Sequence, residues 1–151
     1  MKKALQQREE DLMLKNHFRQ FIGVQIEEIN EGTAVIALPF NEKLLQSANM
    51  IHGGVLSVLI DSVIGTAIRS VLNDDTFAVT AEMNVNYFRP AMKGTIRAKG
   101  KVINKGRSLV VGSADIFSED GKLLATGRAT YAIKEKKQKK NRTGGIIWQK
   151  N

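Results

Sequence analysis

Apolar and polar residues alternate along six segments of this chain, and that alternation predicts strands. In the clearest segment, residues 96–102, small and apolar side chains take every second position and basic side chains take the positions between them. A period of two is typical of a strand that buries one face. The predicted strands are Val24–Ile29, Thr33–Phe40, Phe77–Phe88, Thr95–Asn104, Ser108–Phe117 and Lys122–Ile133.

Two other segments follow a helical pattern. Gly54–Ser70 is apolar on nearly every side of a helix, and a helix of that kind is buried rather than laid on a surface. Lys2–Ile22 spaces its apolar residues among charged ones, which predicts an amphipathic helix that Gly23 ends. The last strand carries a row of small residues, including Gly127, that would let a thick helix lie close to the sheet.

The order of these elements predicts an α+β fold. The chain is predicted to contain two strands, then one buried helix, then four further strands. One long antiparallel sheet that wraps around the buried helix accounts for this order, and the N-terminal helix is added to it. The sequence has no internal repeat and no sign of a second domain, so residues 1–133 are predicted to form a single domain. Residues 134–151 begin with a run of charges and are predicted to be a basic, solvated C-terminal tail.

Length and composition narrow the class of protein. The 151 residues can bury a core without staples, and the absence of cysteine excludes disulfides, thiolate zinc sites and a cysteine nucleophile. No segment is long and apolar enough to span a bilayer and the N-terminus lacks a secretory signal, so we expect a cytoplasmic protein without a membrane partner. The net charge of +8 suits nucleic acid, an anionic membrane or a phosphorylated ligand, and charge alone does not choose among them.

Asp61 is the anomalous residue of the apolar helix. A carboxylate among leucine, isoleucine and valine side chains is costly unless it is paired or used in chemistry. In one interpretation the helix leaves a single stripe, made of Ser57, Asp61 and Gly65 at helical spacing, in contact with water or a partner. In the other, Asp61 is a catalytic carboxylate. The residues alone leave both interpretations open.

The same helix begins at Ile51-His52-Gly53-Gly54. Unblocked backbone N–H groups at a helix start, together with the helix dipole, favour negative charge and can bind a phosphate or stabilise an oxyanion. Glycine pairs also occur at such junctions for conformational reasons alone. A lone histidine such as His52 is likewise more often a loop or core residue than a catalytic one.

The spacing of these two features constrains any catalytic role. Gly53 and Asp61 are eight residues apart, or about 12 Å along one helix. Groups that act on one carbonyl must lie about 3 Å from it, so one chain cannot supply both. If both are catalytic, the helix must lie antiparallel to its copy in a second subunit, and each site takes the amide from one chain and the carboxylate from the other. Catalysis therefore requires a symmetric homodimer.

Gln46, His52-Gly53-Gly54 and Asp61, with this spacing, resemble the motif of the PaaI-like hotdog thioesterases, and Val79–Pro90 resembles the strand after their central helix. The similarity runs from about Phe18 to Ile133 and agrees with the order of strands and helix. It implies a hotdog fold and hydrolysis of an acyl-CoA, with coenzyme A as part of the substrate and no separate cofactor. Thioester hydrolysis needs an oxyanion donor and a base or nucleophile but no metal, and no metal-ligand spacing is present in the sequence.

The resemblance implies a role for each matching position. Gly53 is the residue whose N–H polarises the thioester carbonyl, and Asp61 is the carboxylate that attacks the carbonyl or activates water. Gln46 is expected near the thioester oxygen, and His52 close to the thioester. Thr80 is expected to hold the water or the carboxylate across the interface.

The nucleotide end of coenzyme A needs cationic or N–H groups for its phosphates. Gly54 at the helix start is expected to contribute to coenzyme A binding. Arg89 follows an aromatic residue at a strand end, and Lys105-Gly106-Arg107 forms a basic turn. The resemblance makes Arg89, Lys105 and Arg107 candidate phosphate contacts, while ordinary surface charge is an equally good explanation for each one.

The leading hypothesis is an acyl-CoA thioesterase that works as a homodimer, with two dimers paired through their sheet faces. A non-catalytic acyl-CoA sensor is the alternative, since hotdog domains also occur attached to DNA-binding regions. A single N-terminal helix lacks the second helix of a helix-turn-helix, so no nucleic-acid partner is expected. A hotdog dehydratase or hydratase would need a second suitable histidine, which we do not find.

The sequence leaves four points open. It does not name the acyl group, and it does not separate coenzyme A from carrier-protein thioesters. Attack by Asp61 itself and activation of water by Asp61 require the same residues. The stretch Thr143–Asn151 has no predicted role.

Overall fold

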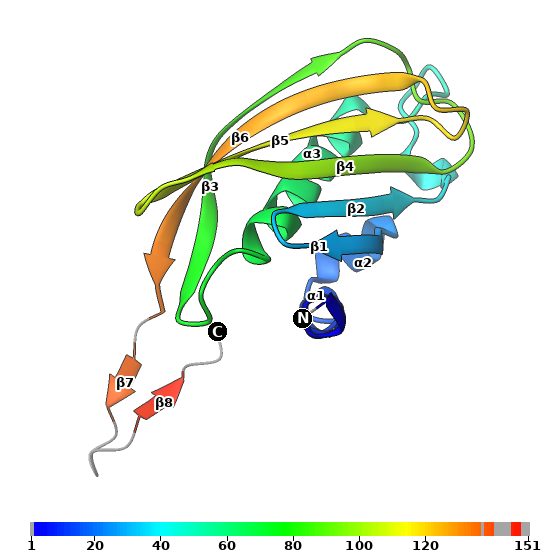
Figure 1. Cartoon of the computed structure of the whole chain (residues 1–151). Helices are drawn as coiled ribbons and strands as arrows, with labels where there is room; N and C mark the ends of the chain where they lie inside the picture. Colours follow the sequence, from blue (N-terminus) through cyan, green and yellow to red (C-terminus); the bar gives the residue numbers. More distant parts are fainter. Residues whose placement is uncertain (1, 137, 141–145, 149–151) are drawn as a thin grey trace.

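A six-stranded antiparallel sheet curves around one long helix, α3 (Gly53–Arg69) (Figure 1). The computed structural model of the chain describes residues 2–136, 138–140 and 146–148. The other helical elements are α1 (Lys2–Met13), α2 (His17–Ile22) and a 3₁₀ turn, η1 (Glu42–Leu44). The sheet strands are β1 (Gln25–Asn30), β2 (Thr33–Leu38), β3 (Thr76–Tyr87), β4 (Ile96–Lys105), β5 (Leu109–Phe117) and β6 (Leu123–Glu135). Their order in the sheet is β1-β2-β4-β5-β6-β3, so β1 and β3 form its two edges.

The predicted α+β hotdog fold is confirmed. Each predicted strand and the central helix is present, with ends that differ from the prediction by at most two residues. β2 ends at Leu38, two residues before its predicted end at Phe40. Pro39 ends the strand because it has no N–H to donate to a neighbouring strand. No helix within the described ranges is long and apolar enough to cross a membrane.

Glycines in three neighbouring strands allow α3 to lie close to the sheet. A Cβ built at Gly100 of β4 would lie 2.9 Å from the backbone carbonyl of Val63 on α3. A Cβ at Gly112 of β5 or Gly127 of β6 would lie 2.5 Å or 2.6 Å from an isoleucine side chain of the same helix. The predicted close approach at Gly127 is therefore confirmed, and it extends across the middle of the sheet.

The predicted N-terminal helix, Lys2–Ile22, is interrupted, and this part of the prediction needs correction. The chain forms two helices, α1 and α2, separated by residues 14–16. Asn16 causes the new start, because its side chain accepts a hydrogen bond from the backbone N–H of Arg19 at 3.0 Å and caps α2. Gly23 ends α2 as predicted, in the left-handed conformation with φ of 86°.

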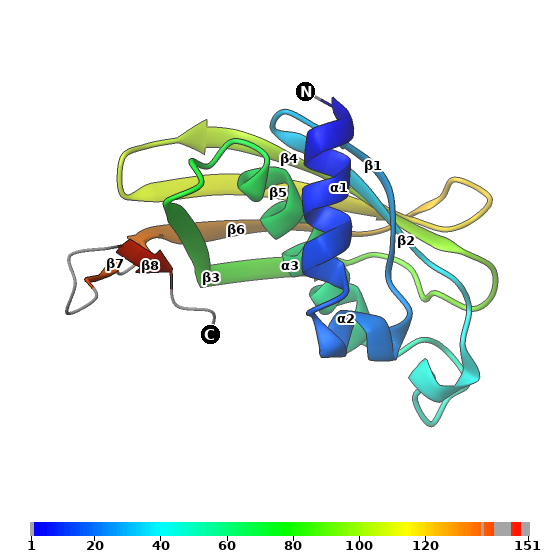
Figure 2. The same cartoon turned by 90° about the horizontal axis from the view of Figure 1, so that it is seen from below.

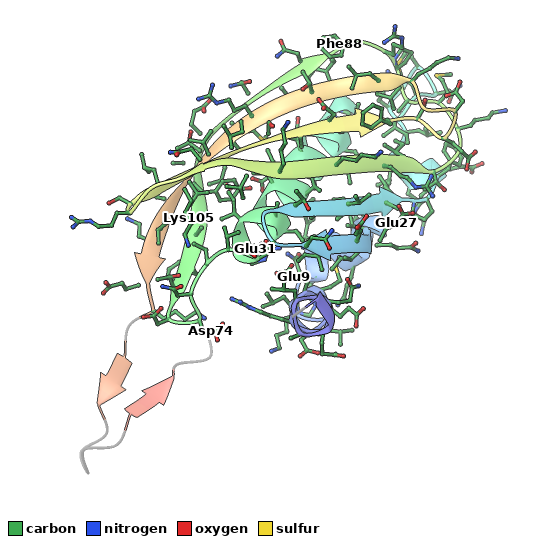
Figure 3. All side chains as sticks on the ribbon, viewed as in Figure 1. Glu9, Glu27, Glu31, Asp74, Phe88 and Lys105 are labelled. Atoms are coloured by element: carbon green, nitrogen blue, oxygen red, sulfur yellow. The ribbon has the colours of Figure 1, made fainter. Side chains whose placement is uncertain are left out.

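An ion pair joins α1 to α3. Glu9 is only 1% exposed, and its two carboxylate oxygens each accept a hydrogen bond at 2.8 Å from the guanidinium of Arg69. Figure 2 shows α1 lying over β1 and the end of α3, and Figure 3 labels Glu9 on the side of α1 that faces the sheet. A buried carboxylate needs such a bidentate partner to offset its lost hydration. The pair therefore fixes α1 and leaves α2 beside the middle of α3.

The end of the chain contains more strand than the sequence predicts. β6 runs to Glu135, two residues beyond the predicted boundary at residue 133. Two short strands, β7 (Gln138–Lys140) and β8 (Ile146–Trp148), pair with each other in antiparallel fashion. Residues 137, 141–145 and 149–151 of the predicted basic tail lie outside the described residues. The division into a domain at 1–133 and a tail at 134–151 stays a prediction.

Replacing Gly100 by alanine tests the close approach of α3. The added methyl group would press on helix backbone, which cannot move aside as a side chain can. We expect Gly100→Ala to lower the free energy of unfolding by about 1–3 kcal/mol, the usual cost of overpacking a core, measured by urea unfolding. Lys101→Ala, the next residue on the exposed face, is the matched control. Equal midpoints for both variants would contradict this account of the packing.

Candidate active site

One stripe of α3 is not covered by the sheet. Ser57, Asp61 and Ser62 are half-buried, whereas the residues on the opposite side of the helix, such as Leu59 and Ile64, are fully buried. The exposed-stripe interpretation is thus correct for Ser57 and Asp61 but wrong for Gly65, which is buried. The stripe is not plain surface, however, because it forms one wall of a cleft of about 580 Å³.

This cleft, which we call the Asp61 cleft, lies between α2, α3 and β3. Its polar lining comes mainly from Arg19 of α2, Asp61 and Arg69 of α3, Thr80 of β3 and Tyr131 of β6. Four elements far apart in the sequence therefore meet around one carboxylate. Apolar side chains, including Phe18 of α2, complete the walls.

Two hydroxyl groups bind the same oxygen of Asp61. Thr80 donates from Oγ1 to Oδ1 at 2.7 Å, and the hydroxyl of Tyr131 lies 2.7 Å from both Oδ1 and the backbone carbonyl oxygen of Asp61. Among the described residues, Oδ2 of Asp61 accepts no hydrogen bond. The carboxylate is thus held in one orientation by one oxygen while the other oxygen is left for chemistry.

Sheet register explains why these two hydroxyls converge. Thr80 of β3 is directly opposite Tyr131 of β6, and directly opposed residues present their side chains on the same face. The register shifts between Thr80 and Glu82, so Ala81 is the extra residue of a β-bulge. Bulges commonly re-aim a side chain next to a functional site. The sequence resemblance implied that Thr80 acts across a subunit interface, but Thr80 contacts Asp61 of its own chain.

Tyr131 is a site residue that the sequence analysis did not identify. Its one signal in the sequence is a large aromatic side chain in the row of small residues on the last predicted strand. Its side chain is buried, and burial, together with the negative charge of Asp61, raises the pKa of the phenol above its ordinary value. The hydroxyl therefore remains protonated and acts as a donor toward Asp61.

Arg19 and Arg69 place positive charge in the same cleft. Arg69 is paired with Glu9 and also donates to Thr66 Oγ1 at 2.9 Å. Burial, and then the nearby charge of Arg69, lower the pKa of Arg19 to about 10, so this guanidinium is still charged at neutral pH. The sequence analysis missed Arg19 as well, because an arginine on an amphipathic helix is usually a surface residue.

The start of α3 forms a second site, with one free amide. His52 is the N-cap, and its Nδ1 accepts the backbone N–H of Gly54 at 2.9 Å. The amide of Gly53 donates to no partner among the described residues, as expected for the first position of a helix. Because Nδ1 is an acceptor, the neutral imidazole of His52 carries its proton on Nε2. Gly54 is thus capped within the chain, and Gly53 is the residue with a donor to offer.

A second cleft, of about 400 Å³, surrounds the Gly53 amide, and we call it the Gly53 cleft. Gln46, Tyr87 and Arg89 share its lining. Tyr87 packs its ring beside Gly53, and its hydroxyl makes a short hydrogen bond to Ser57 Oγ, which fixes the end of β3 against α3. Gln46 and Arg89 therefore share one cleft with Gly53, while their predicted roles toward the thioester and the phosphates stay predictions.

Lys105 and Arg107 lie away from both clefts. Lys105 donates to the backbone carbonyl of Val71, beyond the C-terminal end of α3. Figure 3 shows Lys105 at the end of β4, well separated from Phe88, which lines the Gly53 cleft. Within one chain these two basic residues are therefore not part of the Asp61 or Gly53 cleft.

The two clefts are separated within one chain. Gly53 and Asp61 belong to the same helix, so about 12 Å of helix axis lies between them. No arrangement of a single chain places one carbonyl against both groups. Among the described residues, no three His, Cys, Asp or Glu side chains are grouped so that they could hold a metal ion.

Comparison with known proteins relates this geometry to characterised relatives. The sequence pattern of the thioesterase superfamily matches residues 48–125, which include Gly53, Asp61 and Thr80. A 1,4-dihydroxy-2-naphthoyl-CoA hydrolase of Listeria monocytogenes is 30% identical over 120 residues, covering 80% of this chain and 98% of that protein.

Solved structures agree with the fold. The crystal structure of a thioesterase family protein from Silicibacter pomeroyi has a TM-score of 0.82 at 25% identity and covers 87% of this chain and 98% of that one. The Escherichia coli PaaI protein, from the phenylacetic acid degradation operon, has a TM-score of 0.80 at 23% identity, with 87% and 94% covered. At 23% identity, the similarity to the PaaI protein concerns the fold alone.

The cap at the start of α3 can be tested by substitution. His52→Ala removes the acceptor for the Gly54 amide and should lower the free energy of unfolding by about 1 kcal/mol, the usual effect of losing an N-cap. His52→Asn supplies another acceptor and should restore most of that stability. Thermal unfolding of the two variants provides the measurement. Equal stability of the alanine and asparagine variants would show that His52 does not act as the cap.

Proposed function

The chain belongs to the thioesterase superfamily, and on that premise we propose that it hydrolyses the thioester of a fatty or aromatic acyl-CoA to the free acid and coenzyme A. The observation that carries the proposal is the Asp61 carboxylate, which two hydroxyls hold by one oxygen in an open cleft. Coenzyme A enters as part of the substrate. The coenzyme A hydrolase activity named for the Listeria monocytogenes relative supports this substrate class.

A free sheet edge supports a homodimer. β3 pairs with β6 on one side only, and its other edge carries unpaired backbone groups beside exposed apolar side chains, including Phe77 and Val79. A long apolar edge is a template for another strand. The opposite edge, β1, has six residues against twelve in β3, carries two glutamates and lies beneath α1 (Figure 2), features that disfavour edge pairing. We therefore place the dimer contact at β3.

Two copies of β3 that pair about a two-fold axis would also align their α3 helices. α3 packs along β3, with Thr80 at Asp61 and Tyr87 at Gly53, so symmetric pairing of the strands brings α3 antiparallel to its copy. Each Gly53 cleft then adjoins the Asp61 cleft of the other chain, and two equivalent composite sites result. Pairing of two such dimers into a tetramer stays a prediction.

The reaction assigns different tasks to the two clefts. The N–H of Gly53 from one chain donates to the thioester oxygen and stabilises the negative charge that develops there on attack. Asp61 of the other chain supplies Oδ2, either as the nucleophile that forms an anhydride later opened by water, or as the base that takes a proton from an attacking water. In both routes the carbon–sulfur bond breaks, coenzyme A leaves as a thiolate, and the acyl group becomes a free acid.

Neighbouring side chains orient these groups. Thr80 and Tyr131 hold Oδ1 and so direct Oδ2. Gln46 lines the Gly53 cleft and His52 caps the helix start next to Gly53, so both would lie on the side of the site that receives the thioester oxygen. Arg89 donates one N–H to the carbonyl of Leu123 at 2.9 Å, which fixes its guanidinium at the rim and leaves further N–H groups for a phosphate. Lys105 and Arg107 stay predicted phosphate contacts, which only a partner chain could bring to the site.

Substitution of the site residues tests the proposal directly. Asp61→Asn is nearly isosteric and should abolish most thiol release from acyl-CoA while leaving the fold intact. Thr80→Ala and Tyr131→Phe each remove one hydroxyl and should reduce kcat by about tenfold, less than Asp61→Asn, because each acts through the carboxylate. The measurement is thiol release across short, medium, long and aromatic acyl-CoAs. Turnover by Asp61→Asn equal to the native protein would remove Asp61 from the mechanism.

The sensor alternative has its own signature in the same assay. A protein that binds acyl-CoA tightly and releases no thiol from any substrate would be a sensor, and Asp61→Asn would then leave binding unchanged. Hydrolysis at a rate that depends on Asp61 is the outcome expected here.

Complementation between chains tests the composite site. Gly53→Pro removes the N–H at the first helical position, where proline fits, and His52 already has the extended conformation (φ −60°, ψ 133°) that precedes proline. Gly53→Pro and Asp61→Asn should each be inactive alone. Refolded together at equal amounts, they should recover about a quarter of native activity, because half of the random dimers contain one intact site of two.

Gly53→Ala is the matched control for the proline variant. It keeps the N–H, and its added Cβ meets only the ring of Tyr87 at an ordinary 3.6 Å. If the site lay within one chain, the mixture would stay as inactive as its components, and the shared-site proposal would fail.

A further inference from the structure

Arg19 of α2 is a buried cation with a hydrogen-bond donor that meets no acceptor. Its side chain is 5% exposed and lines the Asp61 cleft. Nη2 reaches Thr66 Oγ1 only at 3.4 Å, and neither Nε nor Nη1 has a hydrogen-bond partner among the described residues. Nε is itself inaccessible, so the terminal nitrogens are the ones that a ligand could meet. Buried charged donors are normally paired, because an unmet one loses its hydration without compensation.

Most of the acceptors near Arg19 are engaged elsewhere. Both oxygens of Glu9, on α1, accept from Arg69 of α3, which also donates to Thr66. Oδ1 of Asp61 is taken by the hydroxyls contributed by β3 and β6. The carboxylate of Asp61 is near enough for its charge to favour the charged form of Arg19, but no hydrogen bond joins the two side chains. Within the described residues, the long bond to Thr66 is thus the one side-chain hydrogen bond that Arg19 makes.

Arg19 lies beyond Asp61 along the cleft. Thr66, which Arg19 contacts, is five residues after Asp61, or about 7.5 Å along the helix axis. In the proposed dimer the phosphates of coenzyme A are at Arg89, on the Gly53 side of the thioester. The acyl group must leave the thioester in the other direction, into the Asp61 cleft.

We propose that Arg19 is a specificity-determining residue whose terminal guanidinium N–H groups bind an oxygen acceptor on the acyl group. The preferred acyl group then carries a hydroxyl, keto or carboxylate oxygen at some distance from the thioester. An arginine offers donors only, so its matching group must be an acceptor. A hydrocarbon acyl group would close the cleft over an unmet donor, and sites of this kind discriminate strongly against it. This inference rests on the proposed function.

The test compares pairs of substrates that differ in their oxygen atoms. One pair is 1,4-dihydroxy-2-naphthoyl-CoA and 2-naphthoyl-CoA, and the other is adipoyl-CoA, which ends in a carboxylate, and hexanoyl-CoA. We expect the native protein to favour the oxygen-bearing member of at least one pair by about tenfold to a hundredfold in kcat/KM, the effect of one bond from a charged donor. The pair that responds identifies a neutral or an anionic acceptor.

Arg19→Met should bring that ratio close to one, because the side chain keeps its length and loses its donors. Arg19→Lys keeps the charge without the planar fork and should give an intermediate ratio. A purely structural role would lower kcat/KM for both members alike and leave the ratio unchanged. Arg97→Gln, at an exposed arginine paired with Glu27 far from the clefts, is the matched control and should keep the native ratio.

Two results would overturn the inference. One is a ratio near one for both pairs in the native protein, and the other is a native ratio that Arg19→Met leaves intact. Thermal unfolding checks that the methionine variant is folded, and if it is not, Arg19→Lys decides the question.

Binding separates this inference from the proposed function. Dissociation constants for each pair are measured by calorimetry on Asp61→Asn with and without Arg19→Met. A preference in binding that needs Arg19, without hydrolysis by the native protein, would refute the thioesterase and leave the role of Arg19 standing. Hydrolysis without any preference in binding or turnover would support the thioesterase and refute the role of Arg19.

Discussion

The short distance between α3 and the sheet is the constraint on which the rest of the structure depends. Gly100, Gly112 and Gly127 leave no room for a Cβ, so the helix backbone and its isoleucines fill the space that side chains of the sheet would occupy. A helix held this closely cannot rotate or slide without a clash. Its one uncovered stripe is therefore fixed in direction, and with it the position of Asp61.

The two N-terminal helices and β3 turn that stripe into a cleft. Glu9 holds α1 at Arg69, and the break at Asn16 turns the chain so that α2 lies beside Asp61 rather than continuing away from it. On the other side, the bulge after Thr80 aims a hydroxyl at the carboxylate. The cleft thus combines a rigid floor with walls that come from the N-terminal helices and from the middle of the chain. Side chains in these walls can be replaced without moving α3. In the proposed enzyme, the residues that select the substrate would therefore be distinct from the residues that carry out the chemistry.

A helix also sets the distance between the groups that it carries. The free amide of Gly53 and the carboxylate of Asp61 are fixed about 12 Å apart by the rise of α3, so in the proposed mechanism a single chain would hold two half-sites rather than one site. The unpaired edge strand β3 runs beside both groups, because Thr80 of β3 contacts Asp61 and Tyr87 of β3 packs beside Gly53. Catalysis and assembly are then coupled in the proposed dimer, since the strand that would join the subunits also carries Thr80 and Tyr87.

The sequence by itself determined the order of strands and helix, the close approach at Gly127, and the separation of Gly53 from Asp61. These are consequences of local periodicity and of helix geometry, which depend on neighbours in the chain. Only the tertiary structure decided that Tyr131 and Thr80 share one oxygen of Asp61, and that Arg19 reaches its cleft. Those contacts join residues that are 19 to 70 positions apart in the sequence. They depend on the sheet register, on a bulge and on a helix break, which position these residues through the packing of the elements that carry them. Local sequence patterns predict the direction in which a side chain points, but they do not predict which distant group it contacts.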